Sequence, residues 1–545
     1  MNESSDRPEA LEPGTEAPSP PFLQTVVRNA PWAIIALMIH VVLIAVLSVI
    51  YVAHTRKKDE QTATSVAISQ PRNEAEVAPV EPPPIIERNA IPKLADTNLD
   101  PTESIKDVFL EAGKVIPDNE VFDDATENEL RGDPTALDLN IPRGDTTGGT
   151  AAGVGTVGHY GTGIPDTVGG SRVGSRYGSR FGGKQGARGT GGGSGTEQSL
   201  KDALEWLRKH QDPDGRWDCD EFSKHCKQNT CDGPGEGVHD IGITGLALLA
   251  FLGDGNTLQV GPYRAVVARS VKWLIGQQNR ENGLLGEPAG ASFLYSHAIG
   301  TLALCEAYSL SNHPAALKEP AQRAINLILA ARNPYKAWRY QYPPNGDNDT
   351  SVTGWMVFAL KAGEEAGLQI DKTAYDAALA WFDEMTDMQT GRCGYQQKGE
   401  ASSRRTGLEK RFPQEKTESL TAVALLCRFF LGQTPEKVPT MRLHADRLRK
   451  TLPVWDVTPD VSVVDEYYWY YGTFAMFQMG GEDWKLWNGA MKKAIVEHQR
   501  QGGDEDGSWD PVGAWGKDGG RVYMTAIGAL CLEVYFRYAK VLGAR

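Results

Sequence analysis

Two carboxylates precede an apolar run in the stretch 345–355, which reads Asn-Gly-Asp-Asn-Asp-Thr-Ser-Val-Thr-Gly-Trp. They belong to Asp347 and Asp349, which are the candidate catalytic residues. A carboxyl group in a dry pocket holds its proton more tightly than in water, which suits a general acid or a ligand-binding group. Aspartate directly before a helix also caps it, because its side chain accepts backbone N–H bonds. Both roles stay open for Asp349.

Aromatic side chains surround this acidic stretch and recur later in the chain. Aromatic faces stabilise cations, and they also fill cores and hydrogen-bond at helix ends. The run 467–471, Tyr-Tyr-Trp-Tyr-Tyr, cannot turn all five side chains to one face of a helix. The candidate ligand-binding residues are Trp338, Tyr340, Tyr342, Thr350, Trp355, His297, Tyr467 and Trp469.

Thiols and imidazoles are concentrated in the segment 219–239. Cys219, Cys226, Cys231 and His239 follow the spacing Cys-x6-Cys-x4-Cys-x7-His. These residue types suit zinc, but the spacing matches no standard Cys-x2-Cys site, so we expect no metal and no cofactor. A Cys226–Cys231 disulfide is an alternative if the segment lies outside the cytoplasm. Small unpaired thiols in an apolar environment are another.

These residues belong to a helical pattern that recurs between Ser199 and Arg545. A small residue opens an apolar helix six times, at intervals of 51 to 68 residues, and an amphipathic helix precedes each copy. Such a period indicates one supersecondary unit stacked on copies of itself. We expect six helical hairpins, in an open solenoid or a closed ring. The small residues are Thr244, Gly300, Thr353, Thr421, Gly472 and Thr525.

The turn after the first amphipathic helix carries a motif of Trp206-Leu207, Gln211, Gly215 and Trp217. With Ala203 it resembles the QW repeat of squalene cyclases, Ala-x2-Trp-Leu-x3-Gln-x3-Gly-x-Trp. The resemblance implies an all-α fold, an (α/α)6 toroid of six helical hairpins that protein prenyltransferases share. Weaker copies of the motif follow at 271–283, 381–391 and 495–509.

The stretch around Asp349 resembles the segment of squalene cyclases that carries the protonating acid, written Asp-x-Asp-Asp-Thr-Ala-Val. When the two are aligned on Asp-Thr-x-Val, the last aspartate is Asp349, and the two earlier acids fall on Asn348 and Gly346. Protonating an alkene needs a strong acid, which neighbouring carboxylates help to arrange. The resemblance therefore implies the architecture of a cyclase with an incomplete acidic motif.

One apolar run long enough to cross a bilayer precedes the repeats. It extends from Trp32 to Val52 and is interrupted only by His40 and Ser48. The basic residues 56–58 would place the C-terminal part in the cytoplasm by the positive-inside rule. However, His40 and the Pro-rich segment 81–84 resemble the anchor and spacer of TonB-type proteins, which send their C-terminal part outward. We favour a single-pass membrane protein with an extracytoplasmic C-terminal domain.

The other N-terminal residues have the composition of linkers, because they are rich in Pro, Gly and charge and poor in apolar side chains. The predicted organisation is a disordered acidic tail at 1–29, a transmembrane helix at 30–53, a polar acidic Pro-containing linker at 54–142, a Gly/Arg-rich flexible tether at 143–195 and the toroid at 196–545.

Composition and motifs narrow the function. A formal net charge of −14 argues against nucleic acid as a specific partner. The sequence has no P-loop, nucleophile elbow or His-Glu-x-x-His motif. We expect a membrane-anchored toroid that binds an apolar, peptide or glycan ligand in its central cavity without full cyclase chemistry. The alternatives are a terpenoid cyclase that uses Asp349 as general acid and a structural envelope docking module. As an enzyme, it would be an isomerase or cyclase acting on an isoprenoid, or a transferase.

Overall fold

The structure is a computed structural model, and it describes residues 192–538 apart from 228–230, 291 and 459. The predicted tail, transmembrane helix and linker, and nearly all of the tether, lie outside the described residues and stay predictions. Among the described residues, no helix combines the length and the apolar character needed to cross a membrane.

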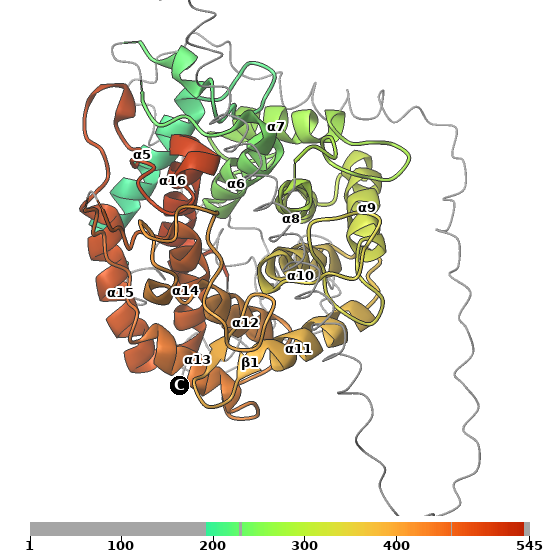
Figure 1. Cartoon of the computed structure of the whole chain (residues 1–545). Helices are drawn as coiled ribbons and strands as arrows, with labels where there is room; N and C mark the ends of the chain where they lie inside the picture. The colour runs from blue at the N-terminus through green and yellow to red at the C-terminus, as the bar shows by residue number, and fades with distance from the viewer. Residues whose placement is uncertain (1–191, 228–230, 291, 459, 539–545) are drawn as a thin grey trace, which may run out of the picture. The chain divides into compact units, whose positions relative to one another are not determined.

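Twelve α-helices make up the described part of the chain and alternate between an outer and an inner position (Figure 1). Each inner helix packs against the inner helix of the next hairpin, and α16 packs against α6, so the set closes into a ring. The sequence prediction of a ring of six hairpins is confirmed in this part of the chain. The outer helices are α5 (Ser194–Lys209), α7 (Arg264–Gly276), α9 (Ala315–Ala330), α11 (Thr373–Met385), α13 (Thr440–Leu448) and α15 (Gly481–Val496). The inner helices are α6 (Asp240–Gly253), α8 (Phe293–Leu310), α10 (Thr350–Glu365), α12 (Ser419–Phe430), α14 (Glu466–Met479) and α16 (Gly516–Leu532).

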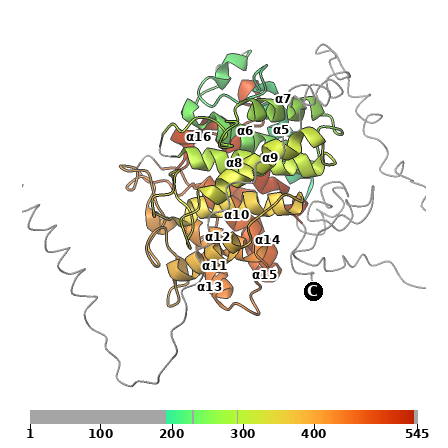
Figure 2. The ribbon, with the colours of Figure 1, turned by 90° about the vertical axis from the view of Figure 1, so that its right-hand side faces the viewer.

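Short elements join the helices. A two-residue antiparallel hairpin pairs β1 (Thr386–Asp387) with β2 (Arg392–Cys393), with Thr386 opposite Cys393. Seen from the side, the hairpins stack from α7 and α8 down to α13 (Figure 2). The 3-10 turns are η2 (Phe222–His225), η3 (Gly237–His239), η4 (Gln414–Lys416), η5 (Gly503–Glu505) and η6 (Glu533–Tyr535).

The inner and outer helices differ in how many of their faces are buried. Nearly every residue of α8 and α14 is buried, because their apolar side chains point in all directions and neighbours cover every face. The outer helix α5 buries Leu204 and Trp206 but exposes Lys201 and Arg208. This is the pattern of an amphipathic helix that covers a core on one side only.

The Gln–Gly turn of the repeat motif links neighbouring hairpins. Gln211 donates from Nε2 to the carbonyl of Gly215 in its own turn at 3.0 Å and to that of Val266 in α7 at 3.1 Å. Gly215 has φ of 106°, and a Cβ there would lie 2.2 Å from the carbonyl oxygen of Arg269, so no other residue fits. Gln499 repeats the arrangement at the end of the ring and donates to the carbonyl of Ser199 at 2.7 Å. The motif therefore closes the ring as well as building it.

The small residue of each repeat lies inside its inner helix rather than at the first residue. Helix α10 begins at Thr350 and α14 at Glu466, earlier than Thr353 and Gly472, because polar and aromatic residues extend these helices toward their N-termini. The hydroxyl of Thr353 accepts the backbone N–H of Trp338 at 3.3 Å, and Thr244 accepts that of Trp217 at 3.0 Å. The repeated hydroxyl thus fixes the turn that precedes each of these helices.

Residues that follow α16 close one end of the ring. Arg537 donates to the carbonyl of Leu249 in α6 at 2.7 Å and pairs with Glu306 of α8 at 2.9 Å. It also pairs with Glu533 at 2.6 Å. The side chains of Arg537, Glu306 and Glu533 are all 0% exposed. A buried ion network therefore occupies this end of α6 and α8 in the described chain.

Candidate functional site

Carboxylates gather where the inner helices begin. Gly242 of α6 lies against Ser296 of α8, and Gly245 lies against Ile299, so these neighbouring inner helices run in the same direction. The positive end of a helix dipole stabilises negative charge. The acids in this position are Asp240, Asp349, Glu418, Asp465, Glu466 and Asp518.

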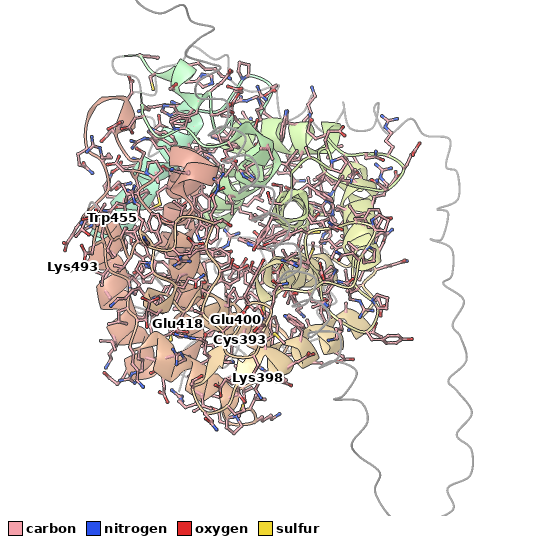
Figure 3. The ribbon with its side chains drawn as sticks, viewed as in Figure 1. Cys393, Lys398, Glu400, Glu418, Trp455 and Lys493 are labelled. Carbon is pink, nitrogen blue, oxygen red and sulfur yellow. The ribbon has the colours of Figure 1, made fainter. Side chains whose placement is uncertain are left out.

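Most of these acids pair with an arginine, and the pairs formed by Asp465 and Glu418 are the most buried. Asp465 accepts from Arg404 at 2.7 Å, with both side chains almost fully buried. Glu418, labelled in Figure 3 beside Cys393, pairs with Arg392 at 2.7 Å and with Arg447 at 2.5 Å. Arginine charge keeps the pKa of Glu418 below its ordinary value, against the burial that would raise it. These pairs give Asp465 and Glu418 a structural role at the start of their helices.

Asp349 is bonded differently through its two carboxyl oxygens. Oδ1 accepts the backbone N–H of Val352 at 2.7 Å, so the residue caps α10. Oδ2 is buried and has no hydrogen-bond partner among the described residues. The nearest cationic atom is Nε of Arg339, 3.8 Å away. Burial raises the pKa of Asp349 to about 7, although the amide of Val352 and the charge of Arg339 oppose it. Asp349 thus combines one oxygen that caps α10 with a second, weakly acidic oxygen that lies nearest to the charge of Arg339.

Tyrosines from three other segments face this carboxyl. The hydroxyl of Tyr295 hydrogen-bonds to Ser351, and the hydroxyls of Tyr340 and Tyr395 lie 2.5 Å apart. Burial, followed by the charge of Asp349, raises the pKa of Tyr467 well above its ordinary value. We call this set the Asp349 cluster, and its members are Asp349, Arg339, Ser351, Tyr295, Tyr340, Tyr395 and Tyr467.

The structure brings together only some of the residues singled out in the sequence. Tyr340 and Tyr467 lie in the Asp349 cluster, but Asp347 is exposed and pairs loosely with Arg339 at 3.4 Å. Thr350 donates to the carbonyl of Gly394 at 2.6 Å, beneath the site. Tyr342 is partly buried and packs against the core.

Two other candidates, Trp338 and His297, make their hydrogen bonds within the fold. Trp338 is fully buried and donates from Nε1 to the carbonyl of Ile328 at 2.8 Å. His297 accepts the N–H of Leu285 at Nδ1, and its Nε2 lies 3.1 Å from the carbonyl of Ala324. Burial lowers the pKa of His297 to about 4, so this imidazole is neutral. Its two ring nitrogens are occupied by backbone groups.

Aromatic side chains fill the centre of the helical toroid at the level of Trp355. This indole stacks on Tyr470 with centroids 5.6 Å apart and meets Tyr471 edge-on at 5.4 Å. Phe358 and Phe430 continue the packing at 4.9 Å. The sequence predicted a central cavity, but the structure fills the centre at this level with side chains of α10, α12 and α14. Ligand contact is therefore expected nearer the first residues of the inner helices, and we call this end of the ring its mouth.

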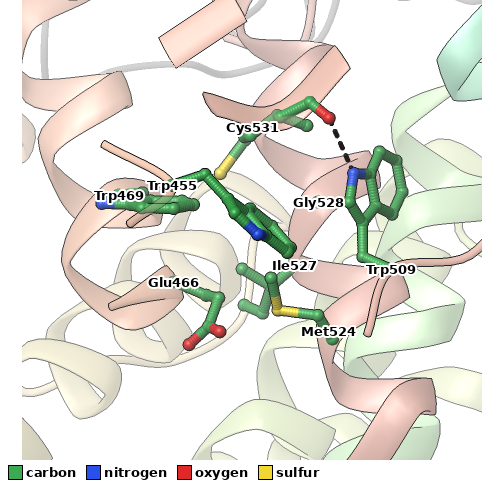
Figure 4. Close-up of a pocket in the computed structure, with 9 residues that line it drawn as sticks. Trp455, Glu466, Trp469, Trp509, Met524, Ile527, Gly528 and Cys531 are labelled. Carbon is green, nitrogen blue, oxygen red and sulfur yellow. Dashed lines mark hydrogen bonds between the residues drawn. The ribbon is translucent and has the colours of Figure 1, made fainter. Parts of the chain in front are cut away.

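A separate small pocket lies between α14 and α16 (Figure 4). Its empty volume is about 210 Å³, including space open to solvent, and Asp349 is not among its lining residues. Burial raises the pKa of Glu466, the one carboxyl in its wall, to about 8. Three of its nine lining residues are tryptophans, Trp455, Trp469 and Trp509. Trp469 therefore lines this pocket rather than the Asp349 cluster.

The four residues weighed as zinc ligands in the segment 219–239 lie in different groups. Cys226 and Cys231 lie together, and the third member of their group is His210. Cys219 is found with Asp220 and Asp240, whereas His239 lies with Glu236 and Asp518. The four residues proposed from spacing do not form one site among the described residues. Sequence inspection missed His210, because it stands in the repeat motif and not in the loop.

The partly ionised state of Asp349 gives the first testable prediction. The unfolded chain loses this proton near pH 3.8 and the folded chain near pH 7, so the unfolded state binds fewer protons between these values. The stability contribution of Asp349 therefore falls as the pH rises through this window and stays low above it. Asp349→Asn cannot ionise and still caps the helix. We expect the variant to gain stability over the wild type from pH 4 to pH 8, by up to about 4 kcal/mol.

Urea unfolding of both proteins at pH 4, 6 and 8 measures this difference. Asp347→Asn is the matched control, because its carboxylate is exposed two residues away. A difference for Asp349→Asn that stays flat or shrinks with rising pH contradicts the assignment of Asp349 as a buried acid.

Comparison with known proteins gives no family for this chain. No family model and no curated protein matches it. Among solved structures, it is similar to an alpha-amylase from Clostridium perfringens, with 12% identity, a TM-score of 0.42 and coverage of 62% of this chain and 98% of the other. It is also similar to the type II terpene cyclase MstE from Scytonema, with 12% identity, a TM-score of 0.39 and coverage of 62% and 97%. A third similar structure is that of cellobiose 2-epimerase from Bacillus thermoamylovorans, with 13% identity, a TM-score of 0.43 and coverage of 62% of this chain and 97% of the other.

Proposed function

We propose that the ring binds a hydroxylated ligand of the glycan class at its mouth, and that the Asp349 cluster recognises it. The main support for this proposal is Oδ2 of Asp349, which is buried among tyrosines and has no hydrogen-bond partner in the described chain. A buried polar atom of this kind costs free energy unless a ligand or water satisfies it. A carboxyl group retained there is better explained by binding than by stability.

The chemistry of the cluster favours sugars over the other ligands predicted from sequence. A carboxyl group near its pKa and a tyrosine hydroxyl can each donate and accept hydrogen bonds. Tyr295 and Tyr340 also present rings, with centroids 6.0 Å apart, that suit the apolar face of a sugar. Ligand sites with apolar walls and a few converging polar groups follow this pattern. An isoprenoid would leave these polar groups unsatisfied.

The loop between β2 and α12 borders the cluster. The loop contributes Tyr395, and Arg405 further along it reaches Glu236 at 2.9 Å and Asp518 at 2.8 Å. Arg405 and Glu236 are more than 40% exposed. Exposed ion pairs of this kind contribute about 0–1 kcal/mol each. These pairs restrain the loop weakly at Arg405, whereas the buried Arg404–Asp465 pair holds the same loop firmly.

A terpenoid cyclase is the second candidate, favoured by the raised pKa of Asp349, which leaves a protonated acid available near neutral pH. Against it, the rings of Trp355, Tyr470 and Tyr471 occupy space that a long isoprenoid would need. A structural docking role predicts neither bound ligand nor product.

The test uses the purified full-length protein with two sets of probes, neutral trisaccharides of glucose and mannose, and squalene with geranylgeraniol. Calorimetry measures binding of the sugars, and mass spectrometry detects retained ligands and products. We expect a trisaccharide to bind, and Asp349→Asn and Tyr467→Phe to weaken binding at least tenfold, because each removes a group facing the ligand.

Asp347→Asn is the matched control and should keep wild-type affinity. Equal weakening by the control, or no binding of any trisaccharide, contradicts the proposal. Conversion of squalene that Asp349→Asn abolishes would establish the cyclase reading instead.

A further inference from the structure

Two thiols and an imidazole meet beside the end of the first outer helix. His210 directly follows α5, and Cys226 and Cys231 flank the segment after η2. Nε2 of His210 lies 3.6 Å from Sγ of Cys226 and 3.7 Å from Sγ of Cys231. The two sulfur atoms are 3.0 Å apart. The three atoms belong to a group that is distinct from the Asp349 cluster.

The imidazole of His210 is held in one orientation. Its Nδ1 lies 2.8 Å from the carbonyl oxygen of Trp206, and its ring stacks on that indole with centroids 4.0 Å apart. Phe222 packs edge-on against it, and the side chain is 2% exposed. A carbonyl only accepts, so Nδ1 carries the proton and Nε2 turns its lone pair to the sulfurs. Metal-binding histidines show this pattern, with the second nitrogen fixed by a backbone carbonyl.

We propose that His210, Cys226 and Cys231 bind one zinc ion. Zinc takes thiolate sulfur at about 2.3 Å and imidazole nitrogen at 2.0–2.1 Å in a tetrahedral arrangement. In that geometry a ligand nitrogen and a ligand sulfur lie about 3.6 Å apart, which matches both N–S distances here. The sulfurs need only move apart by less than about 1 Å to reach the corresponding S–S separation.

Zinc binding requires a neutral imidazole and thiols that have lost their protons. Burial lowers the pKa of His210 to about 4, so the imidazole is neutral and its lone pair is available. Burial, followed by the neighbouring Cys226, raises the pKa of Cys231 to about 12. Without a cation this thiol stays protonated and unreactive. Zinc would displace the thiol protons, and its charge would offset the cost of burying the thiolates.

Three protein ligands leave one tetrahedral position for water or another small ligand. The nearby His225 does not fill it, because its Nε2 lies 2.5 Å from the carboxylate of Asp212. The group is not the four-residue set predicted from spacing, since Cys219 and His239 lie in other groups.

The zinc would stabilise the closure of the ring. Directly after Cys231, the side chain of Asp232 pairs with Arg521 of the last inner helix, and the carbonyl of Gly233 accepts the Arg521 N–H at 2.8 Å. Glu236 continues the contact by donating its N–H to the carbonyl of Asp518 at 2.8 Å. A metal that fixes Cys231 to the end of α5 therefore holds the segment that joins the first hairpin to the last.

The test measures zinc in the full-length protein, purified with thiols kept reduced and then reconstituted with zinc alone. Mass spectrometry of the elements should find one zinc per chain. Cys226→Ser, Cys231→Ser and His210→Gln should each reduce it more than tenfold. Cys219→Ser is the matched control, because its thiol lies in the same loop and donates to the carbonyl of Glu236 at 2.8 Å. The control should keep its zinc.

Cobalt replacement of zinc in the wild type makes the result independent of how the variants fold. We expect the absorption of a thiolate-to-cobalt transition and of four-coordinate cobalt. Absence of these bands, absence of zinc after reconstitution, zinc retained by the Cys231→Ser variant, or loss of zinc from the control overturns the proposal. So does a Cys226–Cys231 disulfide in peptides from the unreduced protein. None of these results depends on ligand binding at the Asp349 cluster.

Discussion

Arg537→Ala should lower the free energy of unfolding by about 3–5 kcal/mol. The guanidinium lies at the closed end of the ring and pairs with Glu306 and Glu533, all three being 0% exposed. It also bonds the carbonyl of Leu249 in the first inner helix. Removing the cation leaves two buried carboxylates without its compensating charge, and desolvated charges of this kind are strongly destabilising.

Chemical unfolding of the full-length protein measures this loss. Arg405→Ala is the control, because this arginine also bridges two acids but is 42% exposed, and its removal should cost about 1 kcal/mol or less. Replacing Glu306 and Glu533 with Gln in the Arg537→Ala background should recover part of the stability, since no buried charge is then unbalanced. A loss for Arg537→Ala no larger than that of the control would show that the buried ions are not coupled in this way.

Trp217→Ala should cost about 3–5 kcal/mol. The indole is fully buried, and its ring stacks on Phe251 of α6 with centroids 5.8 Å apart. Its Nε1 donates to the carbonyl of Leu207 at 2.7 Å, at the end of α5. Truncation leaves a cavity between the outer and inner helices of the first hairpin and removes the indole hydrogen bond to Leu207, and both effects destabilise the folded state.

Trp273→Ala provides the comparison, because this indole of the second hairpin is only partly buried. Thermal unfolding of the two variants should show the larger drop in melting temperature for Trp217→Ala. Equal drops would mean that burial of Trp217 is not what stabilises the first hairpin.

The ring was predictable because its contacts repeat the sequence motif. Gln211, Gly215 and Trp217 lie within one turn of chain, and each has a function that its residue type dictates: a bridging amide, a left-handed backbone and a large apolar surface. The spacing of these residues therefore predicts the hairpin. Gln499 and Ser199 close the ring by the same rule over 300 positions. The repeat period alone left a solenoid or a ring open, and the resemblance of the motif to that of squalene cyclases implied the ring.

The Asp349 cluster was only partly predictable, because its members come from different hairpins. Tyr340 and Asp349 are close in sequence, but Tyr295 and Tyr395 reach the site from the hairpins on either side. A tyrosine at the start of an apolar helix has no pattern that separates it from a core residue. The partner of the two cysteines was hidden for a related reason, since His210 precedes them by 16 and 21 positions within a helix motif.

Closure of the ring also affects how the chain folds while it is being synthesised. The hydrogen bond between Ser199 and Gln499 cannot form until Gln499, 300 residues further along the chain, has been synthesised. At a translation rate of about 5–20 residues per second, the wait lasts roughly 15–60 seconds. A linear repeat array can fold by adding each unit to the previous one. Here the nascent first hairpin keeps uncovered the apolar surface that α16 later covers. During that interval the newborn chain is vulnerable to aggregation, and a chaperone that shields α5 and α6 would raise the yield of closed rings.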